Sequence, residues 1–366
     1  MKTRAAVLFA PHEPFRIETL DLQPPKSREV LVKLQAAGVC HSDWHIATGD
    51  TKHPLPAVCG HEGSGIVEAV GEGVASVKPG ERVALNWAPN CGSCFYCAHG
   101  RPALCEAYRG LIWQGVLMDG TPRLSLGGKP VYHYCALACF SEYAVVPEAS
   151  CVKLGVETEP RIAALVGCAV STGVGAAVNT VEIPAGASVA VLGAGGIGSC
   201  VVLGARLRGA GTVVVVDRAK EKMKLALELG ATHALEAGPE SPRRIRELTG
   251  GRGADFVFEA VGVPAVQEQA LECVRPGGTL VLVGLAPMGT STQLPGAIIT
   301  RRELTVRGCY YGTCEPARDF PRFARWHAEG KLPLEKLVTR TYALDEINAA
   351  YADLLAGKLA RGVIVF

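Results

Sequence analysis

The sequence predicts an α/β protein in which a doubly wound parallel sheet adjoins a β-rich part. From about residue 174 onward, apolar strands alternate with helical segments, a pattern that is typical of βαβ units. Before about residue 151, short valine-bearing runs are separated by glycine and proline, which favours an irregular β-rich region. A chain of 366 residues is also too long for one ordinary core, so two domains are expected.

Each part contains recognisable elements. In the first part, strands are expected at residues 31–34, 65–70, 82–86 and 142–146. In the second part, strands are expected at 189–192, 212–217, 255–259 and 279–283, with helices after the first strand through 208, at 220–229 and at 264–274. After Gly308 the alternation stops: helices near 316–327 and 344–355 precede a last strand at 363–366. The simplest architecture inserts the alternating part into a chain whose two ends share the other domain.

Composition excludes several classes of function. A net charge of +2 gives no electrostatic reason to expect nucleic acid or an acidic membrane surface as partner. Fourteen cysteines in a long chain that starts without an apolar leader favour a cytoplasmic protein with reduced, partly metal-bound thiols. The uncharged stretch 183–205 is long enough to cross a bilayer. Its six glycines and Pro184 favour a strand, a turn and a helix start instead.

Four cysteines are closely spaced in one segment. Cys91, Cys94 and Cys97 are separated by two residues each, and Cys105 follows after seven more. Such gaps let four thiolates surround one ion, which describes structural zinc. An iron–sulfur cluster is the rival interpretation, but the last gap and the absence of a proline after Cys105 count against it.

A glycine-rich turn follows the apolar run 189–192. Gly193, Gly195 and Gly198 fit a tight turn, a close approach to a pyrophosphate and close helix packing. The amide groups at the helix start, which includes Gly196 and Ile197, would then face the phosphates. About twenty residues on, the next strand ends at Asp217, whose carboxylate would bind the adenosine ribose and select NAD over NADP. The neighbouring Arg218 would stack on the adenine or face solvent, although arginine there also accommodates a 2′-phosphate.

Two further motifs complete a family resemblance. Cys40-His-Ser-Asp-Trp-His45 and Gly60-His-Glu-Gly63 supply thiol and imidazole groups outside the cysteine cluster. With that cluster, the glycine turn and the final segment 357–366, they resemble the zinc-dependent medium-chain alcohol dehydrogenases. The resemblance covers the whole chain. It implies a GroES-like, zinc-binding catalytic domain formed by 1–169 and 311–366, and a Rossmann NAD-binding domain formed by 170–310.

The resemblance also implies the roles of individual residues. The catalytic zinc ligands would be Cys40, His61 and Cys168, with a fourth position left for a water or substrate oxygen. Glu62 matches a carboxylate behind the zinc or an alternate ligand, and Asp43 matches the partner that orients His61. Spacing alone does not distinguish Cys168 from the other cysteines.

Further residues match the coenzyme, proton-relay and substrate positions of the family. Ser42 and His45 match the relay that removes the alcohol proton. His41 and Arg361 would bracket the pyrophosphate, Lys222 would lie near the ribose, and Val283 and Leu285 would lie on the nicotinamide side. Trp87 and Tyr134 match the substrate pocket. A homodimer joined near 298–308 is expected.

The expected activity is oxidation of primary alcohols, aromatic or of medium chain length, to aldehydes with NAD and two zinc ions per chain. One alternative is oxidation of a formaldehyde–thiol adduct, because Arg109 falls where the glutathione-dependent branch has an arginine. That branch's acidic pair is absent from residues 49–56, and Arg109 also fits an ordinary surface charge. A different class of protein, a non-catalytic zinc and nucleotide binder, should have lost part of this set of residues.

Overall fold

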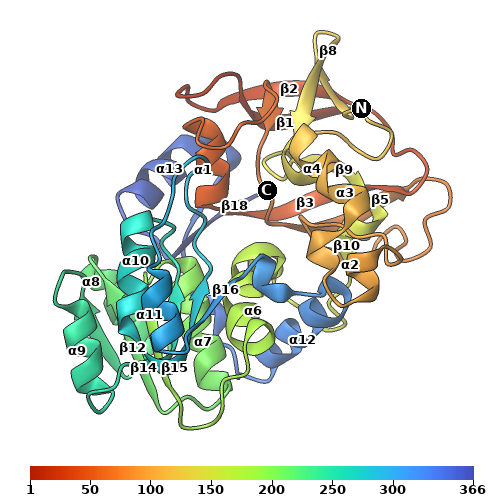
Figure 1. The fold of residues 1–366 in the computed structure, drawn as a ribbon. Helices are drawn as coiled ribbons and strands as arrows, with labels where there is room; N and C mark the ends of the chain where they lie inside the picture. The colour runs from red at the N-terminus through yellow and green to blue at the C-terminus, as the bar shows by residue number, and fades with distance from the viewer.

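Three sheets organise the chain. The computed structural model describes residues 1–366. In Figure 1 the N-terminal red-to-yellow strands lie apart from the green and cyan layers of the nucleotide-type domain, and the C-terminal strand returns to the first group. This arrangement is the α/β class with a β-rich first part that the sequence predicts.

A closed barrel and an open sheet form the β-rich part. The barrel has the order β1, β2, β7, β8, β4. These strands are Lys2–Leu8, Arg16–Leu22, Leu124–Leu126, Lys129–His133 and Ala57–Val58. The open sheet has the order β10, β6, β5, β3, β18, β17, with β9 also paired to β3. These strands are Cys151–Val152, Arg82–Leu85, Gly63–Val70, Glu29–Val39, Arg361–Val365, Val338–Tyr342 and Tyr143–Pro147.

The pairing of β18 with β3 brings the two chain ends together. Gly362 lies opposite Val39, and Val363 lies opposite Gly38, in antiparallel register. β18 starts at Arg361, and β3 ends just before Cys40. This pairing therefore also brings Arg361 close to the start of the segment 40–45. The N-terminal part and the C-terminal strand therefore contribute to one sheet, with the alternating part inserted between them in the chain.

The third sheet has six parallel strands in the order β13, β12, β11, β14, β15, β16. They are His233–Glu236, Thr212–Asp217, Ser188–Leu192, Ala254–Glu259, Val274–Leu282 and Thr305–Gly308. The order reverses between β11 and β14, which is the switch point where doubly wound sheets bind nucleotides. The strand predicted at 279–283 is the second half of β15, which begins directly after a helix.

Helices cover this sheet and connect the two parts. Beside the sheet are α7 (Gly196–Leu207), α8 (Lys220–Glu228), α9 (Ser241–Leu248), α10 (Pro264–Cys273) and α11 (Gly296–Arg301). The β-rich part carries α1 (His41–Ala47), α2 (Phe95–Ala98), α3 (Glu106–Arg109) and α4 (Leu111–Gln114). After the six-stranded sheet come α12 (Pro316–Ala328) and α13 (Ile347–Leu355). Single turns occur at Pro102–Leu104, Tyr134–Ala136, Glu148–Ser150, Tyr311–Thr313, Leu334–Leu337 and Leu344–Glu346.

One long apolar helix links the two parts. It runs from Pro160 to Thr180 as α5 (Pro160–Leu165), a π-helical turn (Val166–Val170), α6 (Ser171–Gly175) and a second π-helical turn (Ala176–Thr180). By length and composition it could cross a membrane, yet 83% of its most apolar window is buried inside the protein. Core helices pass the same test, and this helix packs closely on α7. The stretch 183–205, by contrast, is a strand, a turn and a helix.

Candidate metal and coenzyme site

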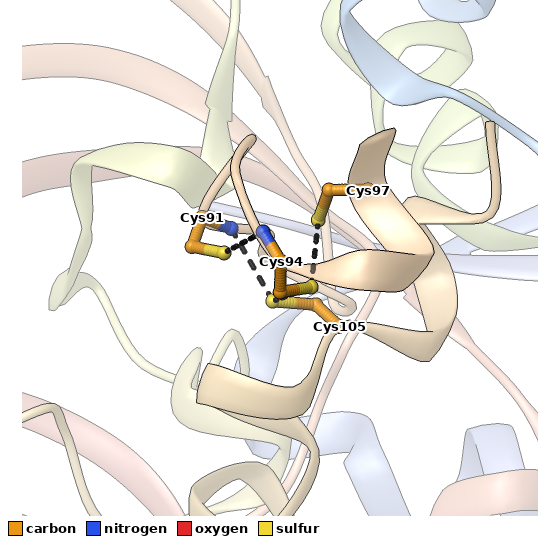
Figure 2. Close-up of side chains that lie close together, drawn as sticks. All are labelled: Cys91, Cys94, Cys97 and Cys105. Carbon is orange, nitrogen blue, oxygen red and sulfur yellow. Dashed lines mark hydrogen bonds between the residues drawn. The ribbon is translucent and has the colours of Figure 1, made fainter. Parts of the chain in front are cut away.

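The four closely spaced cysteines converge on one point. Figure 2 shows the side chains of Cys91, Cys94, Cys97 and Cys105 directed toward one another. All four sulfurs lie within 4.8 Å of one another. The Sγ atoms of Cys94 and Cys97 are 3.5 Å apart, and those of Cys94 and Cys105 are 3.9 Å apart. A tetrahedron with zinc–sulfur bonds of about 2.3 Å needs sulfurs about 3.8 Å apart, so the cluster fits a zinc ion.

Backbone groups support this cluster. The amide of Cys94 donates to Cys91 Sγ at 3.4 Å, and the amide of Cys91 donates to Cys105 Sγ at 3.3 Å. The amides of Ser93 and Cys94 lower the pKa of Cys91 to about 6, because they stabilise its thiolate. Burial raises the pKa of Cys97 and of Cys105, so these two thiols would ionise on binding a cation. The segment is therefore shaped to hold thiolates around a cation.

A second group of metal-binding side chains gathers from three distant segments. Cys40 lies between β3 and α1, His61 and Glu62 lie before β5, and Cys168 lies in the first π-helical turn of the linking helix. Their ligand atoms all lie within 4.8 Å of one another, and all four residues are buried. Two thiols and an imidazole match a zinc site that leaves a position open. The structure thus brings together the residues that the resemblance assigned to the catalytic zinc.

The thiols of Cys40 and Cys168 are coupled in a way that favours metal binding. The neighbouring Cys168 thiol lowers the pKa of Cys40, overcoming burial, and His61 adds to the effect. In turn, the pKa of Cys168 is raised, first by Cys40 and then by burial. Two adjacent thiols that share one negative charge would each give up a proton to a divalent cation.

Asp43 holds the ring of His61 from behind. Its carboxylate lies 3.1 Å from Nδ1 of His61, and it accepts a 2.7 Å bond from the amide of Gly60. Asp43 is fully buried, and burial raises its pKa despite the opposing effect of His61. With Nδ1 occupied by Asp43, the Nε2 atom of His61 is the one left for a metal.

Glu62 and Arg361 form a buried ion pair next to the same group. The side chain of Glu62 is fully buried, and that of Arg361 is 4% exposed. Burial raises the pKa of Glu62 to about 7, although Arg361 opposes the shift. A Cβ on Gly196 would collide with Cδ of Arg361, so the arginine stem lies against the start of α7. Arg361 therefore connects the candidate zinc site to the glycine-rich turn.

The glycine-rich turn has the backbone that a dinucleotide site requires. Gly193 has a φ of +99°, in the region that side chains disfavour, and a Cβ on Gly198 would collide with the carbonyl of Gly193. A Cβ on Gly195 would meet only open space. Oδ2 of Asp217 accepts a 2.7 Å bond from the amide of Ala194, while Oδ1 accepts one from Ala219. The carboxylate of Asp217 is thus fixed beside the turn.

Basic side chains gather at the same place. His41 lies close enough to Arg361 and Lys222 for both cations to lower its pKa, although desolvation is the larger cause. A Cβ on Gly357 would lie 3.8 Å from Nζ of Lys222, so α8 faces the loop that leads to Arg361. Arg218 is exposed beyond Asp217. His41, Lys222 and Arg361 therefore come together from three separate segments, and Arg361 lies against the turn, as an anionic coenzyme would require.

The two predicted relay residues lie on α1 between these sites. Cys40 Sγ and Ser42 Oγ are 3.7 Å apart, so the serine hydroxyl borders the candidate zinc ligands. His45 lies one turn further along the helix, with its side chain 24% exposed, and Nδ1 lies 3.3 Å from Oδ2 of Asp50. The carboxylate partner of His45 was not expected from the sequence.

Comparisons with known proteins agree with this geometry. The chain matches the alcohol dehydrogenase GroES-like domain over residues 26–156 and the zinc-binding dehydrogenase family over residues 196–329. It is 43% identical to an NDMA-dependent alcohol dehydrogenase of Amycolatopsis methanolica over 100% of this chain and 99% of the relative. It is 40% identical to an S-(hydroxymethyl)glutathione dehydrogenase of Escherichia coli over the full length of both chains.

The chain belongs to the zinc-dependent medium-chain alcohol dehydrogenase family. The resemblance stated from its motifs is therefore confirmed. Solved structures agree: a benzyl alcohol dehydrogenase of Acinetobacter calcoaceticus superposes with a TM-score of 0.94 at 32% identity, over 100% of this chain and 99% of that one. A zinc-binding dehydrogenase of Sinorhizobium meliloti, solved with NADP bound, has a TM-score of 0.81 at 27% identity over the full length of both chains.

Aromatic side chains pack against the ring of His61. The ring of Tyr134 lies 5.4 Å from that of His61, and the ring of Trp87 lies 6.3 Å away, both edge to face. Tyr310 packs edge to face on Trp87 at 5.3 Å. Val283 is half-buried after β15, and Leu285 is 57% exposed. Tyr310 was not predicted, because it meets Trp87 only through the fold.

A cavity in the six-stranded-sheet domain lies elsewhere. It measures about 580 Å³, and its lining includes Ser188, Arg252, Asp255 and Arg275. Ser188, Asp255 and Arg275 lie at or near the amino ends of β11, β14 and β15. Coenzymes of doubly wound domains bind at the carboxyl ends. This cavity is therefore separate from the site described above.

Proposed function

We propose that this dehydrogenase oxidises primary alcohols, aromatic or of medium chain length, to aldehydes with NAD. One observation carries the proposal: the group Cys40, His61 and Cys168 lies next to the glycine-rich turn, because Arg361 contacts both Glu62 beside that group and Gly196 of the turn. A zinc site next to a coenzyme site is what hydride transfer from an alcohol carbon needs. The carboxylate of Asp217, fixed beside the turn, supports NAD rather than NADP.

Specific side chains would hold the two cofactors. Cys40, His61 and Cys168 would hold one zinc, with Glu62 as an alternate ligand, and the four-cysteine cluster would hold a structural zinc. When bound, zinc supplies Lewis-acid polarisation of an alcohol oxygen, and NAD supplies the hydride acceptor. Gly193, Gly195, Gly196, Ile197 and Gly198 would bind the pyrophosphate through the helix start, together with Arg361.

The residues of the chain would then handle the proton. Oxidation of an alcohol releases one proton and one hydride, and the proton needs a route out of a dry site. Ser42 borders the ligand group, so its hydroxyl is the first acceptor, and His45 is a base at the partly exposed end of the route. Tyr134 and Trp87, with 3% and 8% of their surfaces exposed, would exclude water and line an apolar substrate slot.

His41 provides a prediction about coenzyme affinity. Arginine is charged at every accessible pH and offers five donors, whereas a neutral histidine offers one. Because surrounding protein and two cations lower the pKa of His41, the wild-type ring is neutral at pH 8. We expect His41→Arg to tighten NADH binding about three- to tenfold at pH 8, as one charge-assisted contact to phosphate predicts.

Fluorescence titration of NADH measures this dissociation constant directly. If NADH release limits turnover, kcat for alcohol oxidation should fall in the same variant. The matched control is His233→Arg, which adds the same charge at the exposed amino end of β13, whereas the glycine-rich turn follows the carboxyl end of β11. Equal dissociation constants for wild type and His41→Arg would disprove the phosphate contact.

One assay tests the activity itself. Purified protein is given NAD or NADP with benzyl alcohol, hexanol, or formaldehyde with and without glutathione, and reduced coenzyme is measured. Because one relative is named for NDMA dependence, each arm is repeated with NDMA as added acceptor. We expect turnover of benzyl alcohol with NAD, and two zinc ions per chain by metal analysis. A protein with both zinc ions and no turnover in any arm would instead be a non-catalytic zinc and nucleotide binder.

A second activity, oxidation of a formaldehyde–thiol adduct, is supported by two observations. A relative that is 40% identical is an S-(hydroxymethyl)glutathione dehydrogenase. Arg109, an exposed residue, lies close enough to Tyr310 for its charge to oppose the rise in pKa that burial causes there. Turnover that requires glutathione in the formaldehyde arm would favour this activity over the first.

We also propose a cytoplasmic homodimer. The strand β16 (Thr305–Gly308) pairs only with β15, so it leaves one edge of the six-stranded sheet open. Exposed strand edges tend to be covered by another strand. Ile298, on the adjacent α11, is 41% exposed. Sedimentation analysis of the purified protein would measure the assembly.

A further inference from the structure

A reversal of the chain after α1 returns a carboxylate to His45. The helix ends at Ala47, and Gly49 has a φ of +77°, a left-handed backbone that turns the chain back. The amide of Thr51 donates to the carbonyl of His45 at 2.9 Å, which holds the returning segment against the helix. Asp50 is consequently brought beside the imidazole of His45.

The contacts of Asp50 determine which nitrogen of His45 carries a proton. Oδ2 of Asp50 accepts a 2.6 Å bond from the hydroxyl of Thr48, and the same oxygen lies 3.3 Å from Nδ1 of His45. The hydroxyl of Thr48 and the imidazole together hold the pKa of Asp50 below its ordinary value, so the carboxylate is ionised. An ionised carboxylate only accepts hydrogen bonds. Nδ1 of His45 is therefore the donor, and Nε2 keeps its lone pair.

We propose that Asp50 is a positioning residue that holds His45 in the tautomer with its basic nitrogen, Nε2, free to receive the alcohol proton. The inference rests on the proposed function, because that function makes His45 the end of the proton route. Asp50 also stabilises the positive charge that His45 gains when it accepts the proton, as the carboxylate of a hydrolase triad does for its histidine.

The charges around this pair come from three segments. His41 lies on the same helix, and the charge of His45 helps to lower its pKa. Asp50 follows the helix. His12, in the loop between β1 and β2, faces Asp50, and its backbone amide donates a hydrogen bond to the carbonyl of Ala47. Asp43 is also on the helix, but it is buried against His61, so Asp50 is the carboxylate that contacts His45. Its removal would therefore leave His45 among cations or neutral rings, which disfavours the imidazolium.

The direct test is the tautomer itself. Nitrogen-15 NMR of histidine-labelled protein, at a pH where His45 is neutral, distinguishes Nδ1–H from Nε2–H. The signal of His45 is assigned from its loss in His45→Gln. We expect Nδ1–H in the wild type, a shift toward Nε2–H in Asp50→Ala, and recovery in Asp50→Glu. An unchanged tautomer in Asp50→Ala would overturn the proposal. This readout does not depend on catalytic activity.

A kinetic cycle tests the consequence for the reaction. Asp50→Ala should lower kcat/KM for benzyl alcohol roughly three- to fivefold, since the pair is partly exposed, and should move the acid limb of the pH profile to lower pH. His45→Gln should lower turnover below neutral pH, with rescue by small exogenous bases. In the His45→Gln background, Asp50→Ala should have no further effect.

The controls separate three outcomes. Asp21→Ala removes a carboxylate from an exposed pair with Lys2, 2.8 Å apart, and should alter neither kcat/KM nor the tautomer. Additive losses in the double variant would contradict the positioning role while leaving His45 as a base. An unchanged pH profile in His45→Gln would instead disprove the proton route of the proposed function, and the NMR result would still decide the role of Asp50.

Discussion

Replacing Cys168 by alanine is expected to remove one of the two zinc ions and to lower alcohol oxidation by on the order of 10³-fold or more. The thiol of Cys168 borders that of Cys40 in the buried ligand group, and its loss leaves one thiol and one imidazole, while Glu62 is held in its ion pair with Arg361. Two protein ligands hold zinc poorly. A catalytic metal contributes several kcal/mol to the transition state, and each ~1.4 kcal/mol corresponds to tenfold in rate.

Metal analysis and steady-state kinetics on the same preparation measure both effects. Cys200→Ala is the matched control, because Cys200 is equally buried on α7 but belongs to neither ligand group. Cys97→Ala should remove the other zinc ion and destabilise the segment that contains α2. If Cys168→Ala keeps two zinc ions and normal activity, the assignment of the catalytic site is wrong.

Local patterns predicted much of the fold and one complete metal cluster. The strand predicted at 212–217 is β12, and the helix predicted at 264–274 ends one residue earlier, as α10. These elements carry their own signals, namely continuous apolar runs and amphipathic periodicity. The four-cysteine cluster could also be predicted, because all its ligands lie within one short segment whose gaps reflect the geometry of the ion.

Contacts between residues far apart in the sequence could not be predicted from local patterns. Cys168 has no ligand-like spacing to Cys40 or His61, and only the family resemblance selected it among fourteen cysteines. Its position depends on a π-helical turn inside the linking helix, which nothing in the local sequence predicted. The contact of Tyr310 with Trp87 likewise depends on how the chain returns after β16. Such contacts are properties of the assembled fold.

Asp50 is an intermediate case. It lies only five residues after His45, so both residues were visible in one short segment. Their contact depends on the end of α1 at Ala47 and on the left-handed backbone of Gly49, and the sequence analysis predicted neither. Recognising a glycine just after a short helix would have indicated that the chain reverses there.

The second large effect concerns the ion pair of Glu62 and Arg361. Arg361→Met removes the cation that pairs with the fully buried carboxylate of Glu62, and breaking a buried pair costs about 3–5 kcal/mol. We expect a fall of several degrees in Tm, together with weaker NADH binding. Arg243→Met, which removes an arginine from exposed pairs with Glu240 and Glu247, should change Tm far less.

The pH dependence identifies the carboxylate as the cause. The pKa of Glu62 is already raised to about 7 with Arg361 present, and loss of the cation raises it further. When the folded-state pKa of a carboxyl group exceeds its unfolded value of about 4.3, the folded protein loses stability as the pH rises from that value toward the folded-state pKa. The deficit of Arg361→Met should therefore be larger at pH 8 than at pH 6. Adding Glu62→Gln should recover part of the loss and remove this dependence, because the buried group then has no charge to leave unpaired. A deficit that is independent of pH, and unchanged in the double variant, would mean that Arg361 stabilises the protein through packing on Gly196 and not through Glu62.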